Sequence, residues 1–112
     1  MTIYHLVPRE EFEALDPSAD YLPVAFAREG LIHLTDGANE LIDVGNRYYR
    51  SDPRPYLALH IDLARVHAPV RYEDPRRAYP HVYGPLNRDA IVGILDVQRL
   101  PTGTFLSISE TR

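Results

Sequence analysis

The positions of ten prolines limit the length of every helix and strand that this chain can form. Proline fixes its own φ and has no backbone N–H, so it disfavours the interior of a helix or of a central strand. Only residues 24–52 form a long segment without proline, and every other element must be short. The prolines stand at positions 8, 17, 23, 53, 55, 69, 75, 80, 85 and 101.

The long segment predicts one principal helix, at about residues 36–50. Thr35, Asp36 and Gly37 form a helix-start signal, and apolar residues then recur at a spacing that places them on one helical face. We expect Gly45, which lies in this stripe, to let the helix approach its sheet closely. Pro8 predicts a second, short helix at residues 9–15. The stripe consists of Ala38, Leu41, Ile42, Gly45, Tyr48 and Tyr49.

Short runs of β-branched, aromatic and other apolar residues predict strands. Residues 56–63 alternate and predict a half-buried strand with His60 on its wetter face, and residues 91–97 predict a buried strand. Further extended segments are expected at residues 3–7, 24–27, 31–34, 70–72, 80–86 and 104–108. Strands outnumber helices and the helices come early, so we expect the α+β class, with mainly antiparallel sheets in a single domain at residues 1–112.

Composition excludes several kinds of chemistry. The 112 residues include no cysteine and no lysine, so disulfides, cysteine nucleophiles and Schiff-base lysines are absent. A net charge of −4 argues against duplex nucleic acid as a partner. The sequence contains neither a phosphate-binding glycine loop nor a His-Glu-x-x-His motif. No signal peptide or membrane span is predicted, and we expect a cytoplasmic protein with no membrane partner.

Three histidines on predicted strands are the candidate functional residues. His5, His33 and His81 each lie in a short β-like run, and we expect them to line one cavity. The alternative is that each is a half-buried sheet histidine whose ring is satisfied by a backbone carbonyl. No two of them lie at a metal-ligand spacing, so no metal is expected.

Three blocks, in this order, resemble the bacterial domain-of-unknown-function 952 family, over about residues 3–108. More distantly, the layout resembles the ADP-ribosyltransferase fold, which includes the RNA 2′-phosphotransferases. The blocks are Ile3-Tyr4-His5-Leu6, Glu29-Gly30-Leu31-Ile32-His33-Leu34-Thr35, and Pro80-His81-Val82-Tyr83-Gly84-Pro85-Leu86 with Asp89-Ala90.

The second resemblance implies roles for individual residues. His5 is similar to the histidine that holds the adenosine ribose of NAD, and His33 falls where related toxins have a nicotinamide-stacking tyrosine. Where that fold has a late catalytic glutamate, this chain offers His81 and Tyr83. A carboxylate would stabilise an oxocarbenium-like state and a neutral imidazole would not, so a shared cleft is better supported than a shared reaction. Glu73 or Asp74 could replace the glutamate only if their loop folded into the cleft.

Two functions follow as hypotheses. The first is a cleft that binds NAD or another phosphorylated ribonucleotide without metal, lined by the three histidines, Thr35 and Tyr83, with Arg28 near phosphate. If this cleft is catalytic, the protein is expected to be a transferase with His33 or His81 as general acid or base. The alternative is a non-catalytic interaction module that keeps the fold with a degenerate site.

Overall fold

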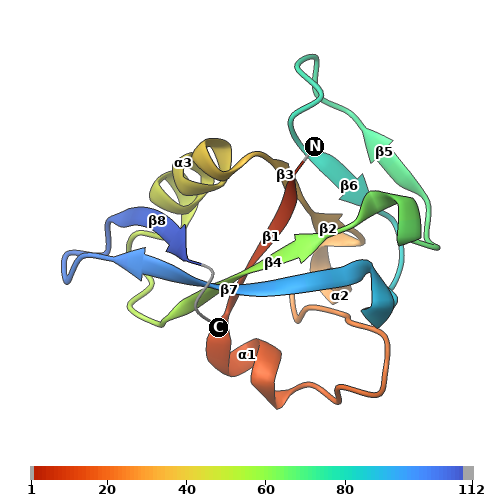
Figure 1. The fold of residues 1–112 in the computed structure, drawn as a ribbon, viewed down its shortest axis with the longest axis horizontal. Helices are drawn as coiled ribbons and strands as arrows, with labels where there is room; N and C mark the ends of the chain where they lie inside the picture. The colour runs from red at the N-terminus through yellow and green to blue at the C-terminus, as the bar shows by residue number, and fades with distance from the viewer. Residues whose placement is uncertain (1, 110–112) are drawn as a thin grey trace.

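The computed structural model describes residues 2–109 and has an α+β architecture with two antiparallel sheets (Figure 1). Two single turns of 3-10 helix, Leu63–Arg65 and Arg88–Ala90, lie between strands. The helices are α1 (Arg9–Ala14), α2 (Phe26–Glu29) and α3 (Ala38–Tyr48). The strands are β1 (Ile3–Pro8), β2 (Ile32–His33), β3 (Thr35–Asp36), β4 (Tyr56–Ile61), β5 (Val70–Tyr72), β6 (Pro80–Val82), β7 (Ile91–Arg99) and β8 (Phe105–Ser109).

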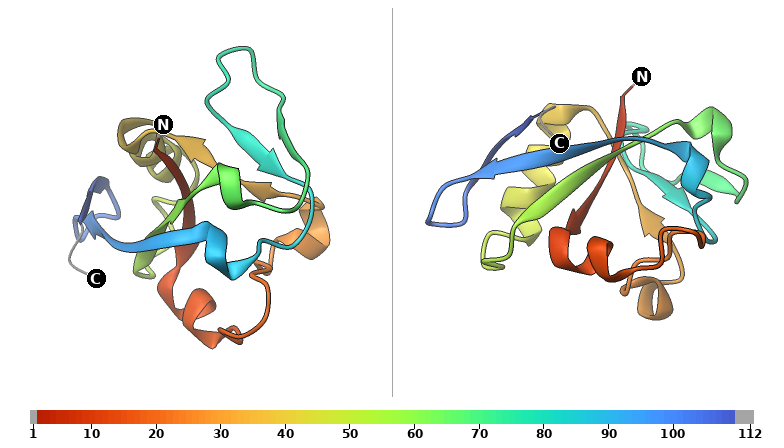
Figure 2. Two further views of the ribbon diagram at one scale, coloured as in Figure 1. Left: turned by 45° about the vertical axis from the view of Figure 1, so that its right-hand side comes forward. Right: turned by 60° about the horizontal axis from the view of Figure 1, so that its bottom comes forward.

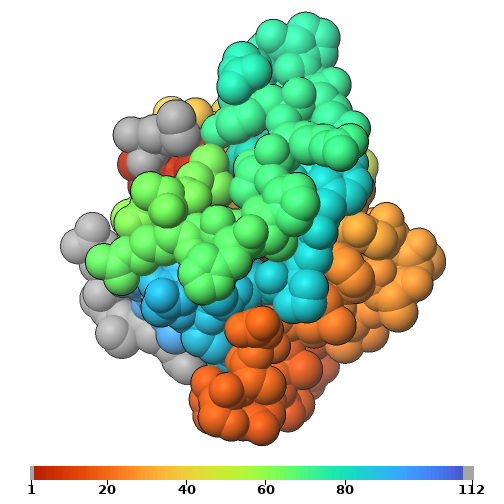
Figure 3. All heavy atoms as spheres, turned by 90° about the vertical axis from the view of Figure 1, so that its right-hand side faces the viewer, coloured from red at the N-terminus to blue at the C-terminus, as the bar shows by residue number. Residues whose placement is uncertain are grey.

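The larger sheet has the strand order β3-β1-β4-β7-β8, and the smaller sheet has the order β2-β6-β5. Every strand pairing within the described residues is antiparallel, which confirms the predicted class and sheet type. The two views in Figure 2 show α3 against the large sheet and the small sheet standing to one side of β1 and β4. The hairpin loop between β5 and β6 projects from the body in Figure 3.

Strand β4 is buried on both faces, whereas the alternating pattern predicted a half-buried strand. Leu57 and Leu59 pack into the main core, and Ala58, on the opposite face, is 0% exposed beneath α3. Of the face predicted to be wetter, His60 alone within β4 is partly exposed. The prediction of a buried strand at residues 91–97 is also wrong in its burial, since β7 is mostly half-exposed.

Helix α3 is shorter than the predicted helix because its start signal belongs to a strand. Thr35 and Asp36 form β3 and pair with β1, and Gly37, with φ of 100°, precedes the first helical residue. The predicted stripe is also partly wrong: Leu41 and Gly45 are buried, but Ala38 is exposed and Tyr48 is 64% exposed. The expectation for Gly45 is confirmed, because a Cβ there would lie 2.6 Å from ring carbons of Phe105 on β8.

Replacing Gly45 by alanine is therefore expected to destabilise the protein. Helix propensity alone favours alanine by about 1 kcal/mol, but the Phe105 ring is 1% exposed and is packed against Tyr56 and Arg99 on its other sides. Overpacking of this kind costs about 1–3 kcal/mol, so we expect a net loss in urea unfolding. Asp43→Ala, at an exposed position of the same helix, is the matched control. A Gly45→Ala protein more stable than wild type would contradict the close approach.

The extended segment predicted at residues 24–27 is wrong, since α2 begins at Phe26. This single turn ends at Gly30, whose φ of 75° lies in the left-handed region that glycine adopts without strain. The turn redirects the chain into β2, which places Arg28 and Glu29 immediately before the strand that carries His33.

Within residues 2–109 no helix is long and apolar enough to cross a membrane.

Candidate functional site

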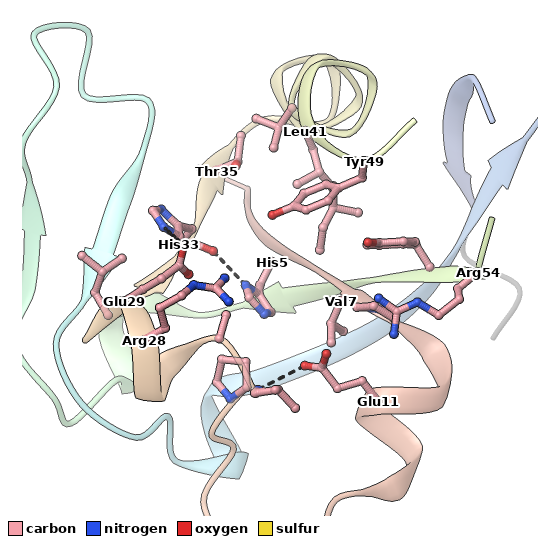
Figure 4. Close-up of a pocket in the computed structure, with 18 residues that line it drawn as sticks. His5, Val7, Glu11, Arg28, Glu29, His33, Thr35, Leu41, Tyr49 and Arg54 are labelled. Atoms are coloured by element: carbon pink, nitrogen blue, oxygen red, sulfur yellow. Dashed lines mark hydrogen bonds and ion pairs between the residues drawn. The ribbon is translucent and has the colours of Figure 1, made fainter. Parts of the chain in front are cut away.

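Two adjoining cavities, of about 330 Å³ and about 670 Å³, lie where α2, β2, β3 and the end of α3 meet. They join because several residues line both of them. Figure 4 shows the first cavity, with the Arg28 side chain pointing toward His5. The residues common to both are Arg28, Glu29, His33, Thr35, Val44 and Tyr49. We refer to the two cavities together as the cleft.

The structure brings most of the sequence-predicted site residues together here. His5 lines the first cavity, His81 lines the second, and Arg28, His33 and Thr35 line both. Tyr83 lines neither cavity, but its hydroxyl donates a hydrogen bond to the carboxylate of Glu73, which lines the second cavity. Neither cavity is lined by all three histidines: His33 lines both, between His5 in the first and His81 in the second.

His5 is buried, and both of its ring nitrogens are bonded to protein groups. Nδ1 donates a hydrogen bond of 2.8 Å to the backbone carbonyl of His33, and Nε2 accepts one of 2.8 Å from the Tyr21 hydroxyl. Burial lowers the pKa of His5 to about 4, so the ring is neutral at pH 7. These contacts match the structural alternative for His5, and its role as a ribose-binding residue stays a prediction.

His33 and His81 form a pair across the small sheet. They are direct cross-strand partners on β2 and β6, and their neighbours Ile32 and Val82 face the core from the opposite side of the sheet. The two imidazoles meet edge to face, with ring centroids 5.1 Å apart. The His33 side chain is 54% exposed, so its ring is available to a ligand while its carbonyl holds His5.

A carboxylate lies beside each imidazole of this pair. Nδ1 of His81 donates to an Oε1 oxygen of Glu73 at 2.9 Å, and the Tyr83 hydroxyl donates to the same oxygen. These hydrogen bonds lower the pKa of the Glu73 carboxyl, which is therefore ionised at neutral pH. On the other side, Glu29 lies 3.6 Å from Nε2 of His33. Glu73 thus lines the cleft. The loop that carries it folds into the cleft, as a replacement for the late glutamate would require.

Glu29 and the tyrosines of the cleft were missed as site residues. Glu29 begins the second of the three family-like sequence blocks and lies four residues before His33. That spacing was the one sign in the sequence that the two side chains could be neighbours. Tyr49 was assigned to the helix stripe, yet its ring lines both cavities. The β5–β6 loop closes the far wall, because Tyr79 donates a hydrogen bond of 2.8 Å to Glu40 at the start of α3.

Two arginines line the second cavity, and they differ in their contacts: hydrogen bonding to the Tyr48 hydroxyl raises the pKa of Arg47. Arg28 makes no side-chain hydrogen bond or ion pair with any of residues 2–109, and it lines both cavities. Arg47 lines the second cavity and lies 5.9 Å from the ring centroid of Tyr48. Arg54, at the other end of the first cavity, is held by Asp52 at 2.8 Å and by Glu10 at 3.3 Å. Arg28 is therefore the cation best placed for a bound ligand.

No set of three or more histidine, aspartate or glutamate side chains in the described part of the chain is arranged to hold a metal ion. The second cavity offers instead the imidazoles of His33 and His81, three carboxylates and the guanidinium groups of Arg28 and Arg47, beside apolar walls. Such a set can neutralise an anion and exchange protons with it.

Comparison with known proteins yields a family and a fold. A family model described as "Protein of unknown function (DUF952)" matches residues 6–94, well over half of the chain. The crystal structure of protein CC0527 from Caulobacter crescentus is similar, with a TM-score of 0.77, 18% sequence identity, and coverage of 95% of this chain and 94% of that one. A double mutant of the same protein gives a TM-score of 0.76 at the same identity and coverage. No curated protein matches. At this identity the two structures show the fold alone, and neither is described with an activity.

Proposed function

Because the chain belongs to the DUF952 family, whose function is unknown, we propose its function from the cleft itself: it binds a phosphorylated ribonucleotide, such as ADP-ribose or NAD. The observation that carries the proposal is the position of Arg28, a cation with no side-chain hydrogen bond or ion pair to any of residues 2–109, where the two cavities join. A nucleotide combines a flat ring with a charged phosphate group, and both cavities combine apolar walls with charged side chains.

The first cavity suits the ring. Its walls include Val7, Pro23, Val24 and Val44, and Tyr49 presents an aromatic ring to it. An aromatic side chain beside aliphatic groups supplies stacking area for a base or a nicotinamide. Ligand pockets commonly combine such apolar walls with a few convergent polar groups.

The second cavity suits phosphate and ribose. Arg28 and Arg47 line it, and the planar guanidinium fork matches two phosphate oxygens at once. The carboxylates of Glu29 and Glu73 line the same cavity and can accept hydrogen bonds from ribose hydroxyls. The resemblance to the ADP-ribosyltransferase fold implies the same class of ligand, and remains part of this proposal.

The proposal predicts weak, metal-independent binding that depends on Arg28. Millimolar ADP-ribose should raise the melting temperature of the wild-type protein, because a ligand that binds only the folded state stabilises it. Losing one charged hydrogen-bond donor costs about 1.5–3 kcal/mol, so Arg28→Gln should weaken binding about ten-fold or more in isothermal titration.

Arg65→Gln is the matched control. It removes the same charge from an exposed arginine that pairs with Asp62 outside the cleft, and it should bind ADP-ribose as the wild type does. If neither NAD, ADP-ribose nor a 2′-phosphorylated nucleotide shifts the melting temperature, the interaction-module hypothesis takes precedence. Equal binding by Arg28→Gln and wild type would show that the ligand binds outside this cleft.

A further inference from the structure

We propose that His33 and His81 act as an acid–base pair that hydrolyses a small phosphodiester, with a ribonucleoside 2′,3′-cyclic phosphate as the substrate class. This inference rests on the proposed nucleotide site and assigns a reaction to it. The observation behind it is a pair of histidines, each beside a carboxylate, on one wall of the second cavity, which Arg28 and Arg47 also line.

The sheet fixes the positions of the two imidazoles. His33 and His81 are opposite each other in the antiparallel register of β2 and β6, so both side chains leave the same face. The buried side chains of Ile32 and Val82 lock that register from the other face, because a slip by one residue would expose them. A phosphate bound over this face can therefore have a different imidazole near each of two of its oxygens.

Glu73 gives His81 the tautomer that a general base needs. The carboxylate can only accept, so the proton of the neutral imidazole is on Nδ1, and Nε2 carries the free lone pair. None of residues 2–109 forms a hydrogen bond with that Nε2. Glu73 is thus a positioning residue for His81, in the way that a buried aspartate orients the histidine of a catalytic triad.

The nucleophile must be water. The chain has no cysteine, and Thr35 is the single residue with an aliphatic hydroxyl among the described residues that line the second cavity. Thr35 is 4% exposed and pairs with Tyr4 on the edge strand β3 of the large sheet, so its buried hydroxyl is poorly placed to attack a ligand. The proton that His81 takes up therefore comes from a water molecule in the cavity.

The two arginines favour phosphate chemistry over cleavage of a glycosidic bond. Attack on phosphorus builds negative charge on the phosphate oxygens, which Arg28 and Arg47 would stabilise. Cleavage of a glycosidic bond builds positive charge on the sugar, which the same guanidinium groups would oppose. The net charge of −4 disfavours a long polyanion, so a mononucleotide is a better substrate than an RNA strand.

The reaction balances without a further reactant. His81 takes a proton from water through Nε2 while the water oxygen bonds to phosphorus. The bond between phosphorus and one ribose oxygen breaks, and protonated His33, beside Glu29, gives its proton to that oxygen. The product is an open nucleoside 2′- or 3′-monophosphate, and the two histidines recover their starting protonation through solvent.

The test is hydrolysis of 2′,3′-cyclic AMP followed by chromatography of the products. General acid–base catalysis contributes roughly 100- to 10,000-fold, so His33→Asn and His81→Asn should each lower kcat at least about 100-fold. Both variants should still bind 3′-AMP, measured by titration. Glu73→Gln should lower kcat by about ten-fold and shift the acidic limb of the pH–rate profile, which the general base sets and which loss of stability alone would not move.

His60→Asn is the control, since His60 lies on β4 outside the cleft lining, and it should hydrolyse the substrate at the wild-type rate. Circular dichroism confirms that each variant is folded. Binding of 3′-AMP without hydrolysis by the wild type would overturn the acid–base pair and leave the nucleotide site intact. Absence of both binding and hydrolysis would overturn the site as well. Hydrolysis that survives both histidine substitutions would also overturn the proposal.

Discussion

Replacing Tyr21 by alanine should lower the free energy of unfolding by about 3–5 kcal/mol, the range for removing a large buried aromatic ring. Tyr21 is 0% exposed, and its ring centroid lies 5.7 Å from that of Phe12 and 5.4 Å from that of His5. Its backbone N–H and carbonyl both bond to Leu86, at 2.7 and 2.9 Å. Tyr21 therefore anchors the loop between α1 and α2 to the core.

A shorter truncation separates the ring from its hydroxyl. Tyr21→Phe keeps the packing but leaves Nε2 of buried His5 without its donor, which should cost about 1–3 kcal/mol. Urea unfolding measures both variants, with Leu22→Ala as the control because this neighbouring side chain is 41% exposed. The control should stay within about 0.5 kcal/mol of wild type. A Tyr21→Ala protein with wild-type stability would show that the loop is not anchored in this way.

Tyr21 also illustrates where sequence patterns stop. Residues 16–23 contain aspartate, proline and serine without apolar periodicity, so they predict a loop and give no sign that one tyrosine in it is fully buried. By contrast, the apolar repeat around Leu41 and Gly45 identified α3 and its close approach to the sheet. Periodicity reports a regular face, whereas Tyr21 is buried by contacts with residues 16 and 65 positions away in the chain.

The errors within regular elements have a related cause. Thr35 and Asp36 carry a helix-start pattern, but pairing with β1 outweighs this local preference. β7 has an apolar sequence, yet its burial depends on what covers each face, and much of it remains half-exposed. Local propensity and composition describe the segment alone, whereas its neighbours in the folded protein decide its secondary structure and its burial.

The candidate site was predictable in its residue types but not in its pairings. The chemistry of the three histidines was evident from the sequence, because few other titratable side chains lie in apolar strands. The contact of His33 with His81 joins positions 48 residues apart, and no spacing rule predicts it. The contact between Glu73 and His81 depends on the path of a polar loop. Because these contacts give His33 and His81 their proposed roles, the structure is needed to separate them from His5.

The different position of His5 leads to the second large prediction, a loss of stability as the pH falls from 6.5 to 4. Burial lowers the pKa of His5 from 6.5 in the unfolded chain to about 4 in the folded protein. Above pH 6.5 the ring is neutral in both states and its full contribution is present. Between pH 6.5 and 4 the unfolded state binds a proton that the folded state does not, so stability falls with pH. At 1.36 kcal/mol per unit, the total loss is about 3 kcal/mol.

The measurement is urea unfolding at a series of pH values from 7.5 to 4. His5→Asn keeps a donor for the His33 carbonyl but has no titrating group, so it should be less stable at pH 7.5 and have a flatter profile through this range. His60→Asn should keep the wild-type slope. The carboxyl of Asp52 has its pKa lowered by Arg54, so its contribution is lost only as the pH falls below about 4, outside this window. An unchanged slope in His5→Asn would show that another group causes the loss, and would contradict a buried neutral imidazole at this position.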